Sequence, residues 1–288
     1  MTVIGTNVAS LRAANASTNA NAALSTAMQR LSTGQRINSA KDDAAGLAIS
    51  DTMTAQIRGR NQGIRNANDG IAMAQTAEGA LGEVSNMLQR VRELTVQATS
   101  GTYSTSDKAN MQAEVSALST QITSTLANTQ FNGNKLFDAS AGTVTAATSA
   151  PAPVAPAYST FKIQAGANAA DSVNVKFNKL TDDTTITNAT SIDLTTATNT
   201  ALATVDSALK TVSTYRAGLG AAQNQLQSAV NNLTTNSTNL TAAKSQITDA
   251  DFSSETTNLA KAQILSQAST AMLAQANQSQ QGVMKLLQ

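Results

Sequence analysis

A heptad pattern runs through residues 202–247, which read LATVDSALKTVSTYRAGLGAAQNQLQSAVNNLTTNSTNLTAAKSQI. Positions taken alternately three and four residues apart form one unbroken seam, which predicts a coiled-coil helix. The seam consists of Leu202, Val205, Leu209, Val212, Arg216, Leu219, Gln223, Leu226, Val230, Leu233, Ser237, Leu240, Lys244 and Ile247. At about 1.5 Å per residue the helix is roughly 70 Å long, so partner helices must lie beside it. We therefore predict a bundle in which the polar seam residues snorkel.

Charged and aromatic side chains are scarce in this chain of 288 residues. Charged residues make up 13% and aromatic residues 3%, whereas an average globular domain is about 25% charged. Hydrophobic residues reach 41%, which is enough for a core. Small, uncharged polar side chains pack closely between helices and between subunits, because no charge has to be desolvated. The composition favours a polymer subunit over a compact enzyme.

The residue types that most often carry enzyme and metal chemistry are missing. The chain has no cysteine and no histidine. Disulfides, the common zinc and iron ligand sets, and Ser-His-Asp or Cys-His catalysis are therefore excluded. We expect no catalytic residue, no cofactor and no metal site, and we predict that the protein is not an enzyme.

The charge and hydropathy patterns exclude two classes of partner. The net charge is +1 and no basic stripe carries interleaved aromatic residues, so we expect no nucleic acid. No run reaches about 18 apolar residues, so we expect no membrane partner. The first residues, MTVIGTNVASLRAANAS, lack the apolar core of a cleaved secretory signal. The protein is then expected either to stay in the cytoplasm or to be secreted by a route that removes no signal peptide.

Three further helical patterns precede the heptad seam. The first is weak and marginal by itself, because it has only two large apolar residues. Its positions are Val8, Leu11, Asn15, Thr18, Ala22 and Ser25. A connector over residues 31–50 follows, and then a second long helix from Ile57 to Ala98. A third helix begins at Ser106 and continues through Leu126.

The middle of the chain predicts a small β region. Residues 141–157 are rich in Ala, Thr and Ser and hold all three prolines, which indicates a loop or linker. Apolar and polar residues then alternate over 161–165 and over 173–177, which is the period of half-buried strands. We predict a β-hairpin here, packed on the bundle. The Thr-rich residues 181–200 are expected to connect it to the heptad helix.

The C-terminal residues repeat the weak pattern of the N-terminus. Residues 262–286 keep the spacing of three and four, but half of the positions are small or polar. Helices that cannot stabilise themselves usually need a partner, and here the two terminal helices themselves and neighbouring copies of the chain fit best. We expect the subunit interface to include Val8, Leu11, Leu265, Met272, Val283 and Leu286.

Several long motifs together resemble bacterial flagellin, the subunit of the flagellar filament. They follow one another in the order of that family and cover nearly the whole chain. The motifs are IGTNVASLRAA (4–14), LSTGQRINSAKDDAAGLAIS (31–50), EGALGEVSNMLQRVRELTVQA (78–98), FNGNKLF (131–137), FKIQAGANAADSV (161–173) and DADFSSETTNLAKAQILSQASTAMLAQANQSQQGV (249–283). The fold class then expected is mainly α, a long antiparallel helical bundle formed by both chain halves with a small β-hairpin between them.

The resemblance also implies a division into domains. Residues 1–45 and 246–288 would form the inner coiled coil that lines the filament core. Residues 46–130 and 196–245 would form the helices of the next shell, with the β-hairpin and loops in 131–195. The outer domains of larger flagellins have no room here, so a short form is expected.

The function implied by the resemblance is self-assembly into the helical filament used for swimming. The expected partners are copies of the chain, the flagellar cap and hook-junction proteins, an export chaperone and the type III export apparatus. Flagellin-like subunits are secreted nearly unfolded to the distal tip, which agrees with the missing cleavable signal. The absence of cysteine fits this route as well, since a crosslinked chain would not thread a narrow channel.

Three other functions were weighed against this one. A hook–filament junction protein shares the terminal motifs, but the match through QRVRELTVQA (89–98) favours flagellin itself. A surface homologue that binds polysaccharide would need aromatic platforms, and only Tyr158 and the hairpin phenylalanines offer one. An inserted metalloprotease domain is excluded because the chain has no histidine. Filaments seen after seeded assembly would separate these alternatives.

One charged segment resembles the flagellin motif that a host Toll-like receptor engages. The segment is QRVREL at residues 89–94. The resemblance implies contacts by Gln89, Arg90 and Leu94, with a further contact by Glu114 on the following helix. A solvated helix face that also serves subunit contacts explains the same residues, and the two interpretations are compatible.

Overall fold

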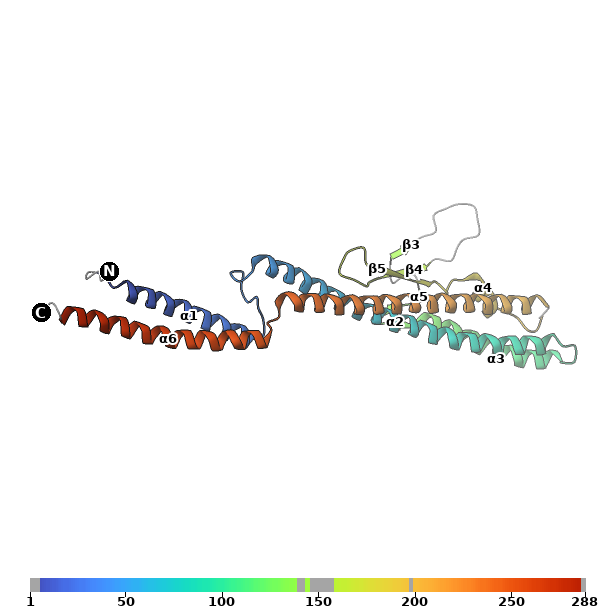
Figure 1. Ribbon diagram of the computed structural model, residues 1–288. Helices are drawn as coiled ribbons and strands as arrows, with labels where there is room; N and C mark the ends of the chain where they lie inside the picture. Colours follow the sequence, from blue (N-terminus) through green and yellow to red (C-terminus); the bar gives the residue numbers. More distant parts are fainter. Residues whose placement is uncertain (1–5, 139–142, 146–157, 197–198, 286–288) are drawn as a thin grey trace. The chain divides into compact units, whose positions relative to one another are not determined.

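The computed structural model describes residues 6–138, 143–145, 158–196 and 199–285 (Figure 1). The chain is mainly α-helical, as the sequence predicts, and forms two compact units. The first unit comprises residues 1–57 and 238–288, and the second comprises residues 58–237. From the sequence, the domain boundaries are expected near residues 45 and 246, in the connectors between helices. The two compact units meet at residues 57/58 and 237/238, inside two long helices.

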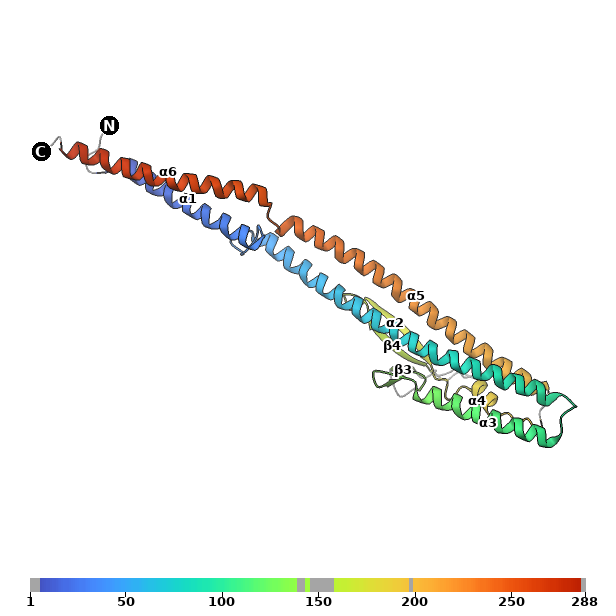
Figure 2. The same cartoon turned by 90° about the horizontal axis from the view of Figure 1, so that it is seen from below.

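The first unit is built on two antiparallel helices, α1 (Val8–Thr33) and α6 (Phe252–Lys285). They lie side by side in both views (Figures 1 and 2). The Asn7 side chain caps α1 by accepting from Ser10 N, and Gly34 ends the helix in the left-handed conformation with φ 67°. Both weak terminal patterns thus form helices, and each has the other as its partner.

The second unit packs long helices around a small β region. Its helices are α2 (Ala44–Thr99), α3 (Thr105–Asn128), α4 (Thr184–Thr190) and α5 (Asn199–Thr248), of which α2 and α5 begin or end in the first unit. The helix predicted from the heptad seam is confirmed as α5. The helix α3 begins at Thr105, one residue earlier than expected, because Ser104 and Asp107 form a reciprocal capping box.

The predicted hairpin is confirmed as part of a three-stranded antiparallel sheet ordered β3-β4-β5. The strands are β3 (Thr143–Thr145), β4 (Tyr158–Gln164) and β5 (Ser172–Asn178). Phe161 pairs with Val175 across the hairpin. A second, minimal hairpin joins β1 (Gln130–Phe131) to β2 (Asn134–Lys135) through an Asn-Gly turn in which both residues have positive φ.

Large apolar side chains from every layer meet in the core of the second unit. The largest fully buried ones in this core are Leu81, Leu88, Ile122, Leu126, Leu136, Phe137, Phe177, Leu180 and Leu226. Phe161 packs edge-on against Phe177, with ring centroids 5.4 Å apart. The helix α4 also contributes Ile186 and Ala189, although the Thr-rich sequence predicted only a connector.

Two polar positions of the heptad seam, Arg216 and Gln223, have a partner on α2 instead of simply snorkelling. Gln223 Nε2 donates to Glu78 Oε2 at 2.8 Å, and Arg216 Nη2 lies 4.0 Å from Glu78 Oε1. One carboxylate on α2 therefore meets two successive polar positions on α5. A polar contact of this kind favours a single register between long helices.

Candidate functional site

Most of the fully buried side chains between α1 and α6 are small. Buried residues on α6 recur every seven positions, at Glu255, Ala262, Ser269 and Ala276. On α1 the buried residues are Ala20 and Ala27, again seven apart. Small residues at seam positions let two helices approach closely, but each buries little apolar area. The pair is therefore closely packed and weakly stabilised.

Several large apolar side chains of the same two helices are exposed, whereas Leu24, Leu31, Leu259 and Leu273 are partly buried. Phe252, the first residue of α6, is 69% exposed. Six others are 47–66% exposed, and they are Val8, Leu11, Met28, Ile264, Leu265 and Met272. We call these six residues the outer apolar face. A soluble monomer rarely leaves so many large apolar side chains uncovered on one pair of helices.

Four of the six expected interface residues belong to the outer apolar face: Val8, Leu11, Leu265 and Met272. The other two expectations, Leu286 and the side chain of Val283, lie outside the described residues. Sequence reasoning missed Met28 and Ile264. A search for large apolar residues off the main seam would have found both.

The expected C-terminal spacing also mixes two faces of α6. Ala262, Ser269 and Ala276 turn toward α1, whereas Leu265 and Met272 lie outside the seam. The faces of α6 differ little in hydrophobicity. A spacing of three and four residues therefore does not distinguish the face toward α1 from the face toward solvent.

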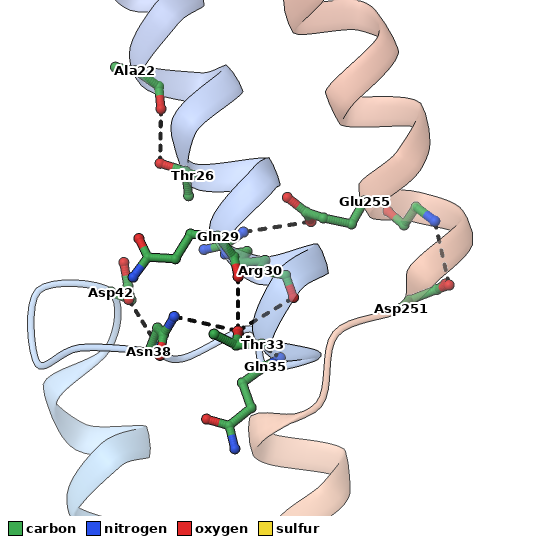
Figure 3. A network of polar contacts seen from close by, with 11 residues as sticks. Ala22, Thr26, Gln29, Arg30, Thr33, Gln35, Asn38, Asp42, Asp251 and Glu255 are labelled. Carbon is green, nitrogen blue, oxygen red and sulfur yellow. Dashed lines mark hydrogen bonds and ion pairs between the residues drawn. The ribbon is translucent and has the colours of Figure 1, made fainter.

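Polar contacts at the lower end of α1 hold the helix to its neighbours (Figure 3). Arg30 Nη1 lies 3.9 Å from Glu255 Oε2 across the two helices, and Arg30 Nε is buried without a hydrogen-bond partner. Thr33 Oγ1 donates to Gln29 O at 3.0 Å and accepts from Asn38 Nδ2 at 3.4 Å. The network ties the end of α1 to α6 and to the connector that follows.

The two connectors of the first unit are paired to each other. Gln35 and Asp249 form an isolated antiparallel bridge. Arg36 N donates to Thr248 O at 2.7 Å, and Arg36 Nη2 donates to Ile247 O at 2.7 Å. The break between α1 and α2 is thereby fixed against the break between α5 and α6.

A capped turn shapes the first connector. The Asp42 carboxylate accepts from the backbone N–H groups of Asn38 and Ser39, which hold its pKa below the usual value. The same oxygen accepts from Ser39 Oγ at 3.1 Å. The Asp42 carboxylate thus holds the turn that precedes α2.

Three of the four expected receptor-contact residues are at the surface. Gln89, Arg90 and Glu114 are exposed, whereas Leu94 is 3% exposed and belongs to the core. Arg90 Nε donates to Glu114 Oε1 at 2.8 Å, and Arg90 Nη1 donates to Glu93 Oε2 at 3.0 Å. Hydrogen bonds to both carboxylates raise the pKa of Arg90.

The expectation for Leu94 therefore needs correction. Its side chain packs in a buried apolar cluster with Val91 and Val205, so it does not offer a surface contact. Arg92 beside it is exposed and binds Asp206 of α5, with Nε and Oδ1 2.6 Å apart. The charged side chains of this segment join α2 to α3 and α5 at the surface.

The described part of the chain holds no cluster of three or more acidic residues, histidines or cysteines that would bind a metal ion. Within the same residues, each helix is too short or too polar to cross a membrane. The outer apolar face is therefore our candidate functional site.

The sequence matches two protein-family descriptions that together span most of its length. Residues 4–142 match "Bacterial flagellin N-terminal helical region", and residues 202–287 match "Bacterial flagellin C-terminal helical region". The chain belongs to the bacterial flagellin family, so it is a structural subunit of the bacterial flagellar filament. The alternatives of a junction protein or a polysaccharide-binding homologue are not favoured by these matches.

Curated relatives agree over nearly the whole length. Flagellin of Bacillus subtilis is 42% identical over 99% of this chain and 99% of its own. Flagellin of Halalkalibacterium halodurans is 42% identical over 91% of this chain and 90% of its own. The "flagellar filament 33 kDa core protein" of Treponema phagedenis is 37% identical over 99% of both chains. A short form without large outer domains fits the length of 288 residues.

Proposed function

We propose that this subunit polymerises through the outer apolar face of α1 and α6. The observation that carries the proposal is the exposure of the outer apolar face, in a helix pair whose fully buried apolar residues are all alanines. Covering one large apolar side chain is worth roughly 1.5–3 kcal/mol. Each added subunit would cover several of them, so the helix pair gains in the filament the burial that it lacks alone.

A charge placed on this face tests the proposal. Leu265 is 47% exposed, so the guanidinium of Leu265→Arg stays solvated in the free subunit. In the filament the same group would be buried without a partner, at a cost of several kcal/mol per copy. We expect unchanged circular dichroism and thermal melting of the monomer, with elongation from seeds slowed at least about a hundredfold.

The matched control is Leu265→Met, which keeps an apolar side chain of similar volume and is expected to elongate filaments at nearly the parental rate. Electron microscopy of seeded reactions gives both rates. If Leu265→Arg elongates as fast as the parent, the terminal helices are not the polymerisation element, and their assignment to the filament core is wrong.

The proposed route to the filament is export without cleavage. The chain would be carried by an export chaperone to the type III apparatus, secreted, and added under the cap onto the hook-junction proteins. Membership of the flagellin family and the absence of cysteine support this route. The outcome is an extracellular filament subunit with a structural function, and we propose no enzymatic activity and no cofactor for it.

A second proposed contact involves a host Toll-like receptor. The exposed groups Gln89, Arg90 and Glu114 lie on neighbouring helices and support a shared surface, which Leu94 underlies from the core. We expect free subunits to stimulate receptor-bearing cells and filaments to remain silent, because subunit contacts would cover the surface.

Substitution of the central arginine tests the receptor contact. We expect Arg90→Ala subunits to be about tenfold less potent than the parent, since interfacial arginines often dominate binding. Arg65→Ala, on the same helix but outside this segment, is the control and should keep full potency. Equal potency of Arg90→Ala and the parent would remove Arg90 from the contact.

A further inference from the structure

An apolar groove lies in the second unit between β5 and α5. Its volume is about 420 Å³, which is within the range of ligand pockets. The floor is apolar and buried, formed by Leu81, Phe137, Phe177, Leu180 and Leu219. The groove is therefore already formed in the free subunit.

Small residues on α5 create the hollow. Gly218, Ala221 and Ala222 line it, and a Cβ atom added to Gly218 would meet no atom within 4 Å. Glycine inside a helix costs about 0.5–1 kcal/mol relative to alanine. The helix accepts this cost at a position where a side chain would project into open space.

The sheet side of the groove is also open to a partner. Among the described residues β5 pairs with β4 alone, so its second edge has free backbone groups. Every sheet residue that lines the groove comes from β5, and Lys176 is the single charged side chain in the lining. The groove therefore fits an apolar or aromatic group that has a carboxylate nearby.

The loop between α2 and α3 carries such a group. Tyr103 is 39% exposed, and within the described part of the second unit it is the one aromatic residue among the exposed large apolar side chains. Asp107 follows four residues later and is exposed. Its Oδ2 atom serves the capping box with Ser104, which leaves Oδ1 available. No residue of this loop lines the groove of its own chain.

We propose that, in the filament, Tyr103 of one copy inserts into the groove of the next copy and Asp107 approaches its Lys176. The inference rests on the proposed assembly function and adds a second contact to it. A side chain and a pocket on different parts of one chain make a heterologous contact, which extends without closing. Such a contact suits a filament, and opposite charges at its rim would fix the orientation.

Two glycine substitutions on the same helix test whether the groove must stay empty. Gly218→Leu adds an apolar side chain to the lining of the groove, at a position where a Cβ meets no atom within 4 Å. Gly220→Leu adds the same side chain at another position whose Cβ is equally open but which does not line the groove. We expect seeded elongation to slow about tenfold for Gly218→Leu and to stay near the parental rate for Gly220→Leu. Equal rates for the two variants would overturn the inference.

Crosslinking tests which group enters the groove. Because the chain has no cysteine, Thr102→Cys combined with Gln225→Cys, at the groove rim, provides a single reactive pair and keeps the Tyr103 ring. We expect a short bismaleimide to link successive copies into a ladder in assembled filaments, and to give no ladder for Val96→Cys with Gln225→Cys, which tests another exposed residue. Filaments that form normally but show no ladder for the Thr102 pair would overturn this contact and leave the terminal-helix proposal intact.

Single substitutions of the inserted ring complete the test. We expect Tyr103→Phe to elongate like the parent, because the ring still fills the groove, and Tyr103→Ser to slow elongation about tenfold. Unchanged elongation by Tyr103→Ser would contradict the inference. Loss of polymerisation by Leu265→Arg together with normal assembly of Tyr103→Ser would show that only the terminal helices drive growth.

Discussion

The α1–α6 pair and the second unit use the same kinds of residue in opposite ways. In the second unit Leu88 is fully buried by helices on more than one side. In the helix pair Leu265 is 47% exposed, while alanines occupy the seam. The second unit completes its own core, whereas the helix pair leaves several of its large apolar side chains exposed.

Geometry explains the difference. Two helices alone can enclose only a narrow seam, whereas α2, α3, α5 and the sheet surround a common interior. The α1–α6 pair therefore needs further molecules to bury its exposed apolar side chains, whereas the second unit does not. The comparison predicts that the same substitution, such as leucine to alanine, will reduce the stability of the fold in the second unit and will reduce filament assembly in the α1–α6 pair.

The largest expected effect comes from matched leucine truncations. Leu88→Ala should reduce the free energy of unfolding by about 2–5 kcal/mol, because it leaves a cavity in a closed core. Leu265→Ala should change the unfolding of the free subunit by less than about 0.5 kcal/mol, since its side chain is already half exposed. Denaturant titration of both monomers measures the difference, and similar losses would break the comparison.

Glycines on α2 sharpen the comparison by showing that close approach also occurs in the second unit. A Cβ on Gly63 would lie 2.8 Å from Gly166 N, in the turn between β4 and β5. We expect Gly63→Ala to destabilise the unit by about 1–3 kcal/mol, because backbone cannot move away cheaply.

The control for this substitution is Gly79→Ala on the same helix. Its Cβ meets nothing within 4 Å, so it should stabilise the unit by about 0.5–1 kcal/mol. Thermal melting distinguishes the two variants by the sign of the shift. Two stabilising shifts would mean that the turn does not rest on α2 in solution.

The smallest expected effect concerns acid and the two helix caps. Hydrogen bonds from Ser104 Oγ and then Ser104 N hold the pKa of Asp107 below its usual 3.8. Because the folded pKa is depressed, the carboxylate stabilises the start of α3 above about pH 4, and this contribution is lost as pH falls through the folded pKa. Asn7, which caps α1, does not titrate.

Amide exchange at the two helix starts checks the acid prediction. As the pH is lowered below 4, protection of the Lys108 amide against exchange should fall relative to that of the Leu11 amide. In Asp107→Asn the ratio of the two protection factors should not change with pH. Parallel changes at both amides would show that acid acts on the whole chain and not on the cap.

Some tertiary features were beyond sequence reasoning for identifiable reasons. The helix α4 lies in a Thr-rich stretch with low helix propensity, and it forms because Asp183 caps it and its Ile186 enters the core. The inward position of Leu94 was missed because the family resemblance was read as a surface motif. The groove beside Gly218 needs residues far apart in sequence and has no local signature.

The sequence by itself determined the family, the long heptad helix α5, the hairpin and the shortage of charge, because motifs, periodicity and composition are local properties. Only the tertiary structure decided which stripe of α6 faces α1, since small and large apolar residues alternate there with little contrast. It also decided that the large stripe remains uncovered in one copy. Exposure depends on what surrounds a helix, and a periodic pattern cannot specify its surroundings.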